Sequence, residues 1–275
     1  MKEEFKFTIF SDVHYEKDRQ KPPLKGIRGM EAAKSFPKFV KSLKKLKNGF
    51  IVNLGDLINH GTEKEFRKVL RPFKNINSPV FHVIGNHELE LFNLEKLKEI
   101  LGLKTSYYYK DFGNYRLVFL NCFDTKTSKP DPRRPSRIIG GKISKKQTAW
   151  LRKILNTREK VIIFSHKLLA DQDLSKNLIW NRAPKRYTQI ENSEEVGKII
   201  EKRKNVLAVF QGHVHQSSFR KINGIYYFAI QGYCQNENYD SKGKASKSFS
   251  KIRITDRKII IEENNRIKKY NLSKK

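Results

Sequence analysis

The sequence predicts an α/β fold, in which a mixed sheet or sandwich has helices on its outer faces. Two observations predict it. Short apolar runs alternate with stretches of helical periodicity as far as residue 204, which is typical of layered α/β proteins. Beyond that point the pattern changes to closely spaced strands separated by turn residues.

The first part of the chain contains both kinds of segment. Apolar runs of strand length occupy residues 5–11, 50–54, 80–84, 115–121, 161–165 and 206–211. One-sided apolar spacing at a helical period covers residues 30–47, 62–73, 94–101, 144–156 and 193–204. Ser144 and Ser193 begin the last two helical segments. We expect them to be N-caps, because a serine hydroxyl accepts a hydrogen bond from the first turn.

The C-terminal third is expected to add strands. They cover residues 217–222, 225–230, 249–254 and 258–263, and Asn223-Gly224 is predicted to form a two-residue hairpin turn. Residues 15–29 and 124–142 are rich in Pro, Gly, Lys and Arg and are predicted to be loops. Because no repeat or change of composition divides the chain, we expect one domain over residues 1–275, with the strands of 217–263 completing its second sheet.

The composition indicates a soluble globular protein with a strongly basic surface. The 275 residues have a formal net charge of +30, and no apolar run approaches the roughly 18–20 residues of a membrane span. The charge either attracts an anionic substrate or nucleic acid, or reflects a solvated lysine-rich surface without a partner. The alternating apolar residues near the N-terminus indicate a strand rather than a signal peptide. Because there are also only 2 cysteines, we expect a cytoplasmic protein.

Side chains of metal-binding types follow five of the predicted strands. In open α/β sheets, ligands bind at the carboxyl ends of strands, and five of the 7 histidines lie there. A lone histidine at a strand end is more often structural than a ligand, but this cluster with aspartates and an asparagine indicates a metal site. The runs are Asp12-Val13-His14, Gly55-Asp56, Gly85-Asn86-His87-Glu88, His166 and Gly212-His213-Val214-His215.

The donor types indicate which ions the site holds. Oxygen and nitrogen donors without thiolate suit Mn, Fe, Zn or Co and differ from the donors of a sulfur-bound structural zinc. Seven donors are too many for one catalytic ion, but they suit two divalent ions that share a carboxylate. The candidates are Asp12, His14, Asp56, Asn86, His166, His213 and His215.

The ordered runs DVH, GD, GNHE, a histidine after an apolar strand, and GHVH resemble the five motifs of the calcineurin-like metallophosphoesterases. The resemblance covers residues 12–215. It implies two packed β-sheets flanked by helices, a four-layer sandwich, and two ions bridged by Asp56. One ion would be held by Asp12, His14 and His215, and the other by Asn86, His166 and His213.

The same resemblance predicts the reaction. Two ions about 3.5–4 Å apart share a water, lower its pKa and direct the resulting hydroxide at phosphorus. The chain is therefore expected to be a hydrolase of phosphoesters or phosphoanhydrides. By the resemblance His87 is not a ligand. Its protonated imidazole is predicted to stabilise the transition state or to protonate the leaving oxygen.

The segment from Gly140 to Leu151 bears on the substrate. It resembles a branch of the family that includes manganese-dependent ADP-ribose/CDP-alcohol diphosphatases, with cyclic-nucleotide phosphodiesterases as near relatives, or it is a helix start whose Trp150 packs on the sheet. We expect a small nucleotide-type phosphodiester or diphosphate as the substrate, and manganese as the metal. The alternatives are a nuclease acting on DNA or RNA, a phosphomonoesterase, and a binding protein without catalysis.

Two segments are candidates for substrate contact. The basic loop either binds a second phosphate, since arginine suits bidentate contact with phosphate oxygens, or is simply solvated; its arginines are Arg133, Arg134 and Arg137. The segment 177–187 either stacks an aromatic ring on a nucleobase or covers the core; it contains Trp180, Arg182 and Tyr187.

Three further polar residues keep open or structural interpretations. Asn59 and His60 follow the GD run closely and either orient metal ligands or cap the next helix. His82 lies inside a predicted strand and is expected to be packed rather than catalytic.

Overall fold

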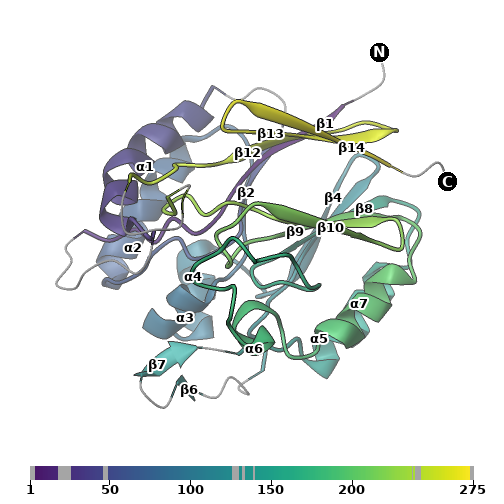
Figure 1. Cartoon of the computed structure of the whole chain (residues 1–275), viewed down its shortest axis with the longest axis horizontal. Coiled ribbons are helices and arrows are strands. Elements are labelled where there is room, and N and C mark those ends of the chain that lie inside the picture. Colours follow the sequence, from purple (N-terminus) through teal and green to yellow (C-terminus); the bar gives the residue numbers. More distant parts are fainter. Residues whose placement is uncertain are drawn as a thin grey trace.

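The structure, a computed structural model, describes residues 4–17, 26–45, 49–125, 130–131, 134–138, 140–236, 238 and 243–272. Two six-stranded sheets pack face to face, and helices cover the outer face of each (Figure 1). The predicted α/β fold, a four-layer sandwich of two mixed sheets flanked by helices, is therefore confirmed. That the chain forms one domain stays a prediction.

The first sheet is mixed. It consists of β1 (Phe5–Phe10), β2 (Phe50–Asn53), β3 (Val80–His82), β12 (Ser250–Ile254), β13 (Lys258–Glu263) and β14 (Arg266–Asn271). Its order is β14-β13-β12-β1-β2-β3. β1 pairs in parallel with β2 on one side and antiparallel with β12 on the other. An N-terminal strand thus lies in the centre of this sheet.

The second sheet is built mainly of parallel strands. It consists of β4 (Tyr108–Phe112), β5 (Tyr115–Phe119), β8 (Lys160–Ser165), β9 (Val206–Gln211), β10 (Ser218–Ile222) and β11 (Ile225–Ala229), in the order β10-β11-β9-β8-β5-β4. The four central strands run parallel. A separate small hairpin is formed by β6 (Pro130–Asp131) and β7 (Arg134–Ile138).

Aromatic side chains fill the space between the sheets. Phe7 of β1 stacks on Phe50 at a centroid distance of 4.9 Å and meets Phe210 of the second sheet edge-on at 5.5 Å. Phe10, three residues further along the strand, points to the opposite face and packs against the helices instead. The carboxyl half of β1 is therefore buried on both faces, whereas Lys6 near its amino end is exposed.

Helices close both outer faces (Figure 1). α1 (Gly29–Leu43), α2 (Glu63–Leu70) and α4 (Leu94–Leu101) bury their apolar sides in a cluster with the first sheet. α5 (Lys145–Ile154) and α7 (Ser193–Glu201) do the same on the second sheet. Shorter elements are the 3₁₀ helix η1 (Arg71–Asn75), α3 (Asn86–Leu91) and α6 (Lys185–Thr188). No helix of the described ranges is long and apolar enough to cross a bilayer.

The C-terminal strands divide between the two sheets, which corrects the prediction that 217–263 completes the second sheet. β10 and β11 join β9, but β12 and β13 join β1 in the first sheet. β1 pairs with β2 along one edge, and β12 occupies its other edge. The hairpin turn at Asn223-Gly224 is confirmed, and both residues have the positive φ that this turn requires.

The sequence does not predict β4, β14, α3 or α6, and the predicted loop 124–142 contains the β6–β7 hairpin. Ser144 caps α5 as expected, because its hydroxyl accepts a hydrogen bond from Gln147 N. The prediction for Ser193 is wrong. Asn192 precedes α7, and its side chain bonds to the backbone of Ile143 rather than capping the helix.

Candidate metal centre

The seven predicted donors meet where parallel strands of both sheets end. The two sheets contribute about equally, and residues far apart in sequence become neighbours: the Nε2 atoms of His14 and His215 are 3.0 Å apart. The first sheet contributes Asp12 and His14 after β1, Asp56 after β2 and Asn86 after β3, and the second contributes His166 after β8 and His213 and His215 after β9.

The backbone at this site is unusual. Five donors have φ between 46° and 69°, the left-handed region that non-glycine residues enter in only a few per cent of cases. Such residues cost about 1–3 kcal/mol each and gather at functional sites. The five are Asp12, His14, Asp56, His213 and His215. The sharp turn at each strand end directs these side chains away from the core and toward one another.

Four histidines have one ring nitrogen fixed by an oxygen. A neutral imidazole has one N–H and one lone pair, so an oxygen acceptor assigns the N–H to the nitrogen it contacts. The pairs are His14 Nδ1 with Asn59 Oδ1 (3.3 Å), His166 Nδ1 with Leu54 O (2.8 Å), His213 Nε2 with Tyr187 O (2.6 Å) and His215 Nδ1 with Gln235 Oε1 (3.1 Å).

The remaining ring nitrogens face each other in two pairs. His14 Nε2 and His215 Nε2 are 3.0 Å apart, and His166 Nε2 and His213 Nδ1 are 3.2 Å apart. In the tautomers assigned above, each pair brings two lone pairs together. Two facing lone pairs repel each other unless a cation or a proton lies between them. Each imidazole pair is thus a position at which a cation can bind.

Two carboxylates surround these points. Asp56 Oδ2 is 3.3 Å from His166 Nε2 and 3.7 Å from His14 Nε2, so it reaches both pairs. Burial alone would raise the pKa of Asp56, but His166, His87 and His14 hold it below its ordinary value. Asp12 Oδ1 is 3.3 Å from His215 Nε2 and has no hydrogen-bond partner although it is buried.

The pair of His166 and His213 also has a potential oxygen ligand beside it. Asn86 Oδ1 is 3.3 Å from His166 Nε2. Burial opposes a charge on His166, yet Asp56 raises the pKa of this ring to about 9. The carboxylates therefore attract positive charge to this point, and in the absence of an ion a proton supplies part of it.

His87 lies at the partly exposed edge of the cluster, where one of its ring nitrogens is within 4.8 Å of ligand atoms of His14 and Asp56. Its Nε2 is 4.0 Å from Asp56 Oδ2, and a quarter of its side chain is exposed, unlike the seven buried donors. Its ring meets that of His14 edge-on at 4.5 Å. Burial lowers the pKa of His87 to about 3, and its catalytic role stays a prediction.

Glu88, to which no role was assigned from the sequence, connects the loop after β2 to the start of α3. Its buried carboxylate accepts hydrogen bonds from the backbone N–H groups of Asp56 and Gly85, both at 3.1 Å, and from that of Leu57. Burial and the Asp56 carboxylate raise its pKa to about 7. A signal was present in the sequence, because an acid three residues after a turn glycine is the capping-box position.

The structure shows the surroundings of the residues whose roles the sequence left open. Asn59 contacts His14, whereas Thr62 caps α2, so Asn59 orients a histidine. His60 is largely exposed, 4.0 Å from Glu16. His82 is buried, as expected. Trp150 packs edge-on against Tyr107 with the cluster of the second sheet, which favours the structural interpretation of its segment.

The candidates for substrate contact are only partly described. The ring of Trp180 lies 5.3 Å from that of His213 and packs on a small apolar cluster, so it covers part of the core beside the centre. Tyr187 contributes its carbonyl to His213, and Arg182 is exposed. Arg133 and the side chains of Arg134 and Arg137 lie outside the described residues.

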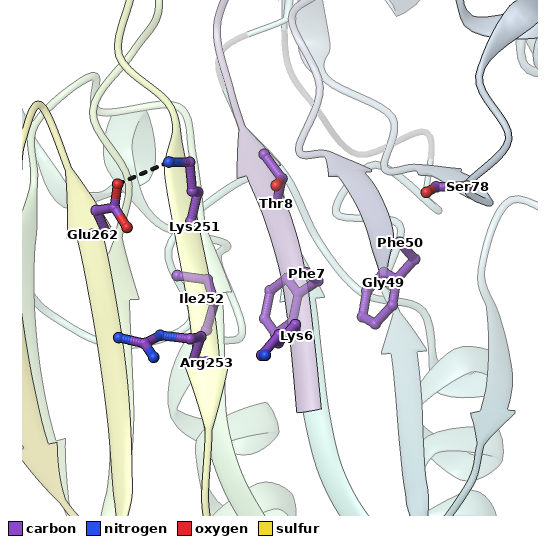
Figure 2. Close-up of a pocket in the computed structure, with 10 residues that line it drawn as sticks. All are labelled: Lys6, Phe7, Thr8, Gly49, Phe50, Ser78, Lys251, Ile252, Arg253 and Glu262. Carbon is purple, nitrogen blue, oxygen red and sulfur yellow. Dashed lines mark hydrogen bonds and ion pairs between the residues drawn. The ribbon is translucent and has the colours of Figure 1, made fainter. Parts of the chain in front are cut away.

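A separate concavity lies on the outer face of the first sheet, with a volume of about 130 Å³ (Figure 2). It is near the amino ends of β1 and β2, whereas the donors follow the carboxyl ends. Its cations have acidic partners: Lys251 pairs with Glu262 at 2.8 Å, and Lys6 and Arg253 pair with Glu4. We therefore assign it no part in the site.

Comparison with protein families agrees with this geometry. The model of the calcineurin-like phosphoesterases matches residues 5–217, which include all seven donors and His87. The chain belongs to the calcineurin-like phosphoesterase family. The matched region includes strands β1 to β3 of the first sheet and the second sheet as far as the GHVH run.

Several curated relatives are similar to this chain over long stretches. A manganese-dependent ADP-ribose/CDP-alcohol diphosphatase from Arabidopsis thaliana is 25% identical over 62% of the chain and 66% of the relative. The enzyme of the same name from Oryza sativa is 27% identical over 61% of the chain and 63% of the relative. A 3′,5′-cyclic adenosine monophosphate phosphodiesterase from Haemophilus influenzae is 24% identical over 83% of the chain and 76% of the relative. The matches thus span a little under two thirds of the two plant enzymes.

A solved structure shares the fold of this chain. A dimetal phosphatase from Danio rerio superposes with a TM-score of 0.75 and covers 98% of this chain and 99% of that one, at 17% sequence identity. A purple acid phosphatase from yellow lupin has a TM-score of 0.62, covering 98% of this chain and 53% of that one, at 15% identity. These likenesses concern the arrangement of the elements alone.

Proposed function

We propose that the chain hydrolyses a small nucleotide-type phosphodiester or diphosphate with two divalent metal ions. The observation that supports this best is the pair of facing imidazole couples, each with its N–H groups turned outward to oxygen acceptors. Histidines fixed in this way present lone pairs and are ready to bind metal. The relatives named above support the class of substrate.

The distances between the donor atoms divide the donors between two ions. Asp12, His14 and His215 would hold one, because the unpartnered Asp12 Oδ1 lies near both Nε2 atoms. Asn86, His166 and His213 would hold the other. Asp56 reaches both groups and would bridge the ions. Oxygen and nitrogen donors suit Mn²⁺, the metal in the names of the two plant relatives.

The bound ions would supply an activated water and would neutralise charge on the phosphoryl oxygens. The side chains and backbone of the protein hold the metal ligands in position. Glu88 holds the loop that presents Asp56, while Asn59 and the carbonyls of Leu54 and Tyr187 keep the histidine rings oriented. Preorganised donors of this kind avoid reorganisation during the reaction.

His87 is proposed to act on the leaving oxygen. Its ring lies at the partly exposed side of the cluster, where substrate can reach it. Because burial lowers its pKa to about 3, the free protein holds the ring neutral. The role therefore requires the negative charge of a bound phosphate to raise that pKa.

The proposal is tested by comparing bis-p-nitrophenyl phosphate with p-nitrophenyl phosphate, using metal-free protein reconstituted with Mn²⁺. We expect faster hydrolysis of the diester and none without metal. ADP-ribose, a CDP-alcohol, cyclic AMP and DNA then form the next panel. A preference for the monoester would contradict the proposal. Full metal loading with no turnover of either ester would indicate a binding protein, and a preference for DNA in the panel would indicate a nuclease.

His87→Ala is the internal control of this experiment. We expect the variant to keep both ions, because His87 stands outside the two imidazole pairs. It should lose about 10²–10⁴-fold in turnover, the usual contribution of a general acid. Metal analysis and steady-state kinetics on the same preparation separate the two effects. Depleted metal in this variant would contradict the assignment.

A further inference from the structure

The segment from Gly232 to Cys234 runs along the end of β1. Tyr233 N donates to Ser11 O at 2.8 Å, and Cys234 N donates to Asp12 O at 3.1 Å. Arg28 N in turn donates to Cys234 O at 2.8 Å. A Cβ at position 232 would lie only 3.0 Å from Cβ of His215, so the glycine permits this close approach. The backbone of Cys234 is thereby fixed beside the first imidazole pair.

The thiol of Cys234 lies inside the metal centre. Its Sγ and a ring nitrogen from each of His14 and His215 are all within 4.8 Å of one another. Asp12 Oδ1 lies 3.8 Å and 3.3 Å from the Nε2 atoms of the same two histidines, and it is buried without a hydrogen-bond partner. The thiol and this carboxylate thus both lie beside the first imidazole pair.

We propose that Cys234 is a further ligand of the ion held by Asp12, His14 and His215, and that its sulfur makes this position select a softer ion than its neighbour. The inference rests on the proposed function, because it adds a donor to one of the two ions proposed there. The sulfur–metal bond forms as the thiol loses its proton to solvent. The set of donors predicted from the sequence contained no sulfur.

The chain contains a matched counterexample. Cys122 is equally buried, but its Sγ contacts Ser165 Oγ at 3.0 Å and it belongs to the apolar cluster between the second sheet and its helices. It behaves as a small apolar residue. Because Cys122 and Cys234 are the only cysteines of the sequence, a sulfur signal that persists without Cys122 belongs to Cys234.

Cobalt provides the test. Metal-free wild-type protein, Cys122→Ser and Cys234→Ser are titrated with Co²⁺, and their absorption spectra are recorded. We expect visible d–d bands in all three, and a near-ultraviolet sulfur-to-cobalt charge-transfer band in the wild type and Cys122→Ser only. The Cys122→Ser spectrum decides the question even if Cys234→Ser does not fold.

The outcomes separate this inference from the proposed function. Visible bands without a charge-transfer band in Cys122→Ser would overturn the role of Cys234 and leave the metal centre intact. Absence of all cobalt bands from the wild type would overturn both. A charge-transfer band that survives in Cys234→Ser would also refute the assignment.

A competition experiment tests the selectivity. Thiolate ligands favour Zn²⁺, whereas oxygen donors suit Mn²⁺. Equilibrium dialysis of the three proteins against both ions should show lower Zn²⁺ over Mn²⁺ occupancy in Cys234→Ser by roughly tenfold or more, since even indirect partners of a metal contribute about 10–100-fold to its affinity. An unchanged ratio would contradict the proposed selectivity.

Discussion

At the scale of single residues, the site depends on how each side chain is presented. Five donors adopt a left-handed backbone conformation, and four histidines have their tautomers set by an oxygen. Two of these oxygens are backbone carbonyls, of Leu54 and Tyr187, so no residue type in the sequence could have revealed them. The donors themselves were predictable, because each directly follows a recognisable strand. Their roles as ligands stay predictions.

Asp56 is the donor shared by both imidazole pairs, and Asp56→Ala should therefore lose tight binding of at least one ion together with activity. The direct measurement is metal content after dialysis, alongside turnover of the diester. Asp256→Ala is a suitable control, because this aspartate is exposed and pairs with Lys160 at 3.1 Å. Full metal content in Asp56→Ala would refute the bridging role.

His82 predicts how stability depends on pH. Burial lowers its pKa to about 4 from an ordinary 6.5, so the unfolded chain binds a proton that the folded chain excludes between these values. Folding stability is then complete above pH 6.5 and falls toward pH 4, by about 3 kcal/mol for this group.

His82→Gln should remove that dependence. Urea unfolding of metal-free protein at pH 7 and pH 4 would show a smaller loss of stability in the variant than in the wild type. If the two proteins lose equal free energy, His82 is not the cause.

At the scale of elements, the longer helices and the buried strands were largely predictable, and two of the four edge strands, β4 and β14, were not. β4 and β14 border their sheets and expose most of their residues, so neither has the apolar run by which a buried strand is recognised. The partners of β12 and β13 were also beyond prediction. Pairing with β1 depends on a contact between the two ends of the described chain, and no local pattern encodes it.

Glu88 joins two elements of the site, the loop after β2 and the start of α3. In Glu88→Gln the amide has one acceptor oxygen, and its NH₂ group faces backbone donors. An unsatisfied buried donor costs about 1–3 kcal/mol, so we expect a loss of stability of that size and weaker metal binding. Denaturant unfolding and a metal titration measure the two effects.

Glu95→Gln provides the control for this change, since Glu95 is exposed on α4 and forms a surface ion pair with Lys98. Equal stability and metal affinity in the Glu88 and Glu95 variants would show that Glu88 does not fasten the loops.

At the scale of the whole molecule, the metal centre joins the two sheets. Asp12, His14, Asp56 and Asn86 come from the first sheet and the remaining donors from the second, so bound ions would connect them across the interface. A ligand that binds only the folded state at 100 times its dissociation constant stabilises by about 2.7 kcal/mol.

Chelation should therefore lower the melting temperature by roughly 5–10 °C in a chain of this length. Thermal unfolding with and without EDTA measures the shift, and Asp56→Ala should show a smaller one. Superimposable wild-type curves would mean that the ions do not stabilise the interface.

The central position of β1 also bears on how the chain folds during synthesis. β1 emerges from the ribosome before the other strands of its sheet, but its antiparallel partner consists of residues 250–254. Until that partner is made, one edge of β1 offers unpaired backbone groups to other chains. The second sheet, whose strands lie between residues 108 and 229, can assemble earlier. Co-translational folding should therefore begin in the middle of the sequence, and the nascent N-terminal strand is the segment most in need of a chaperone.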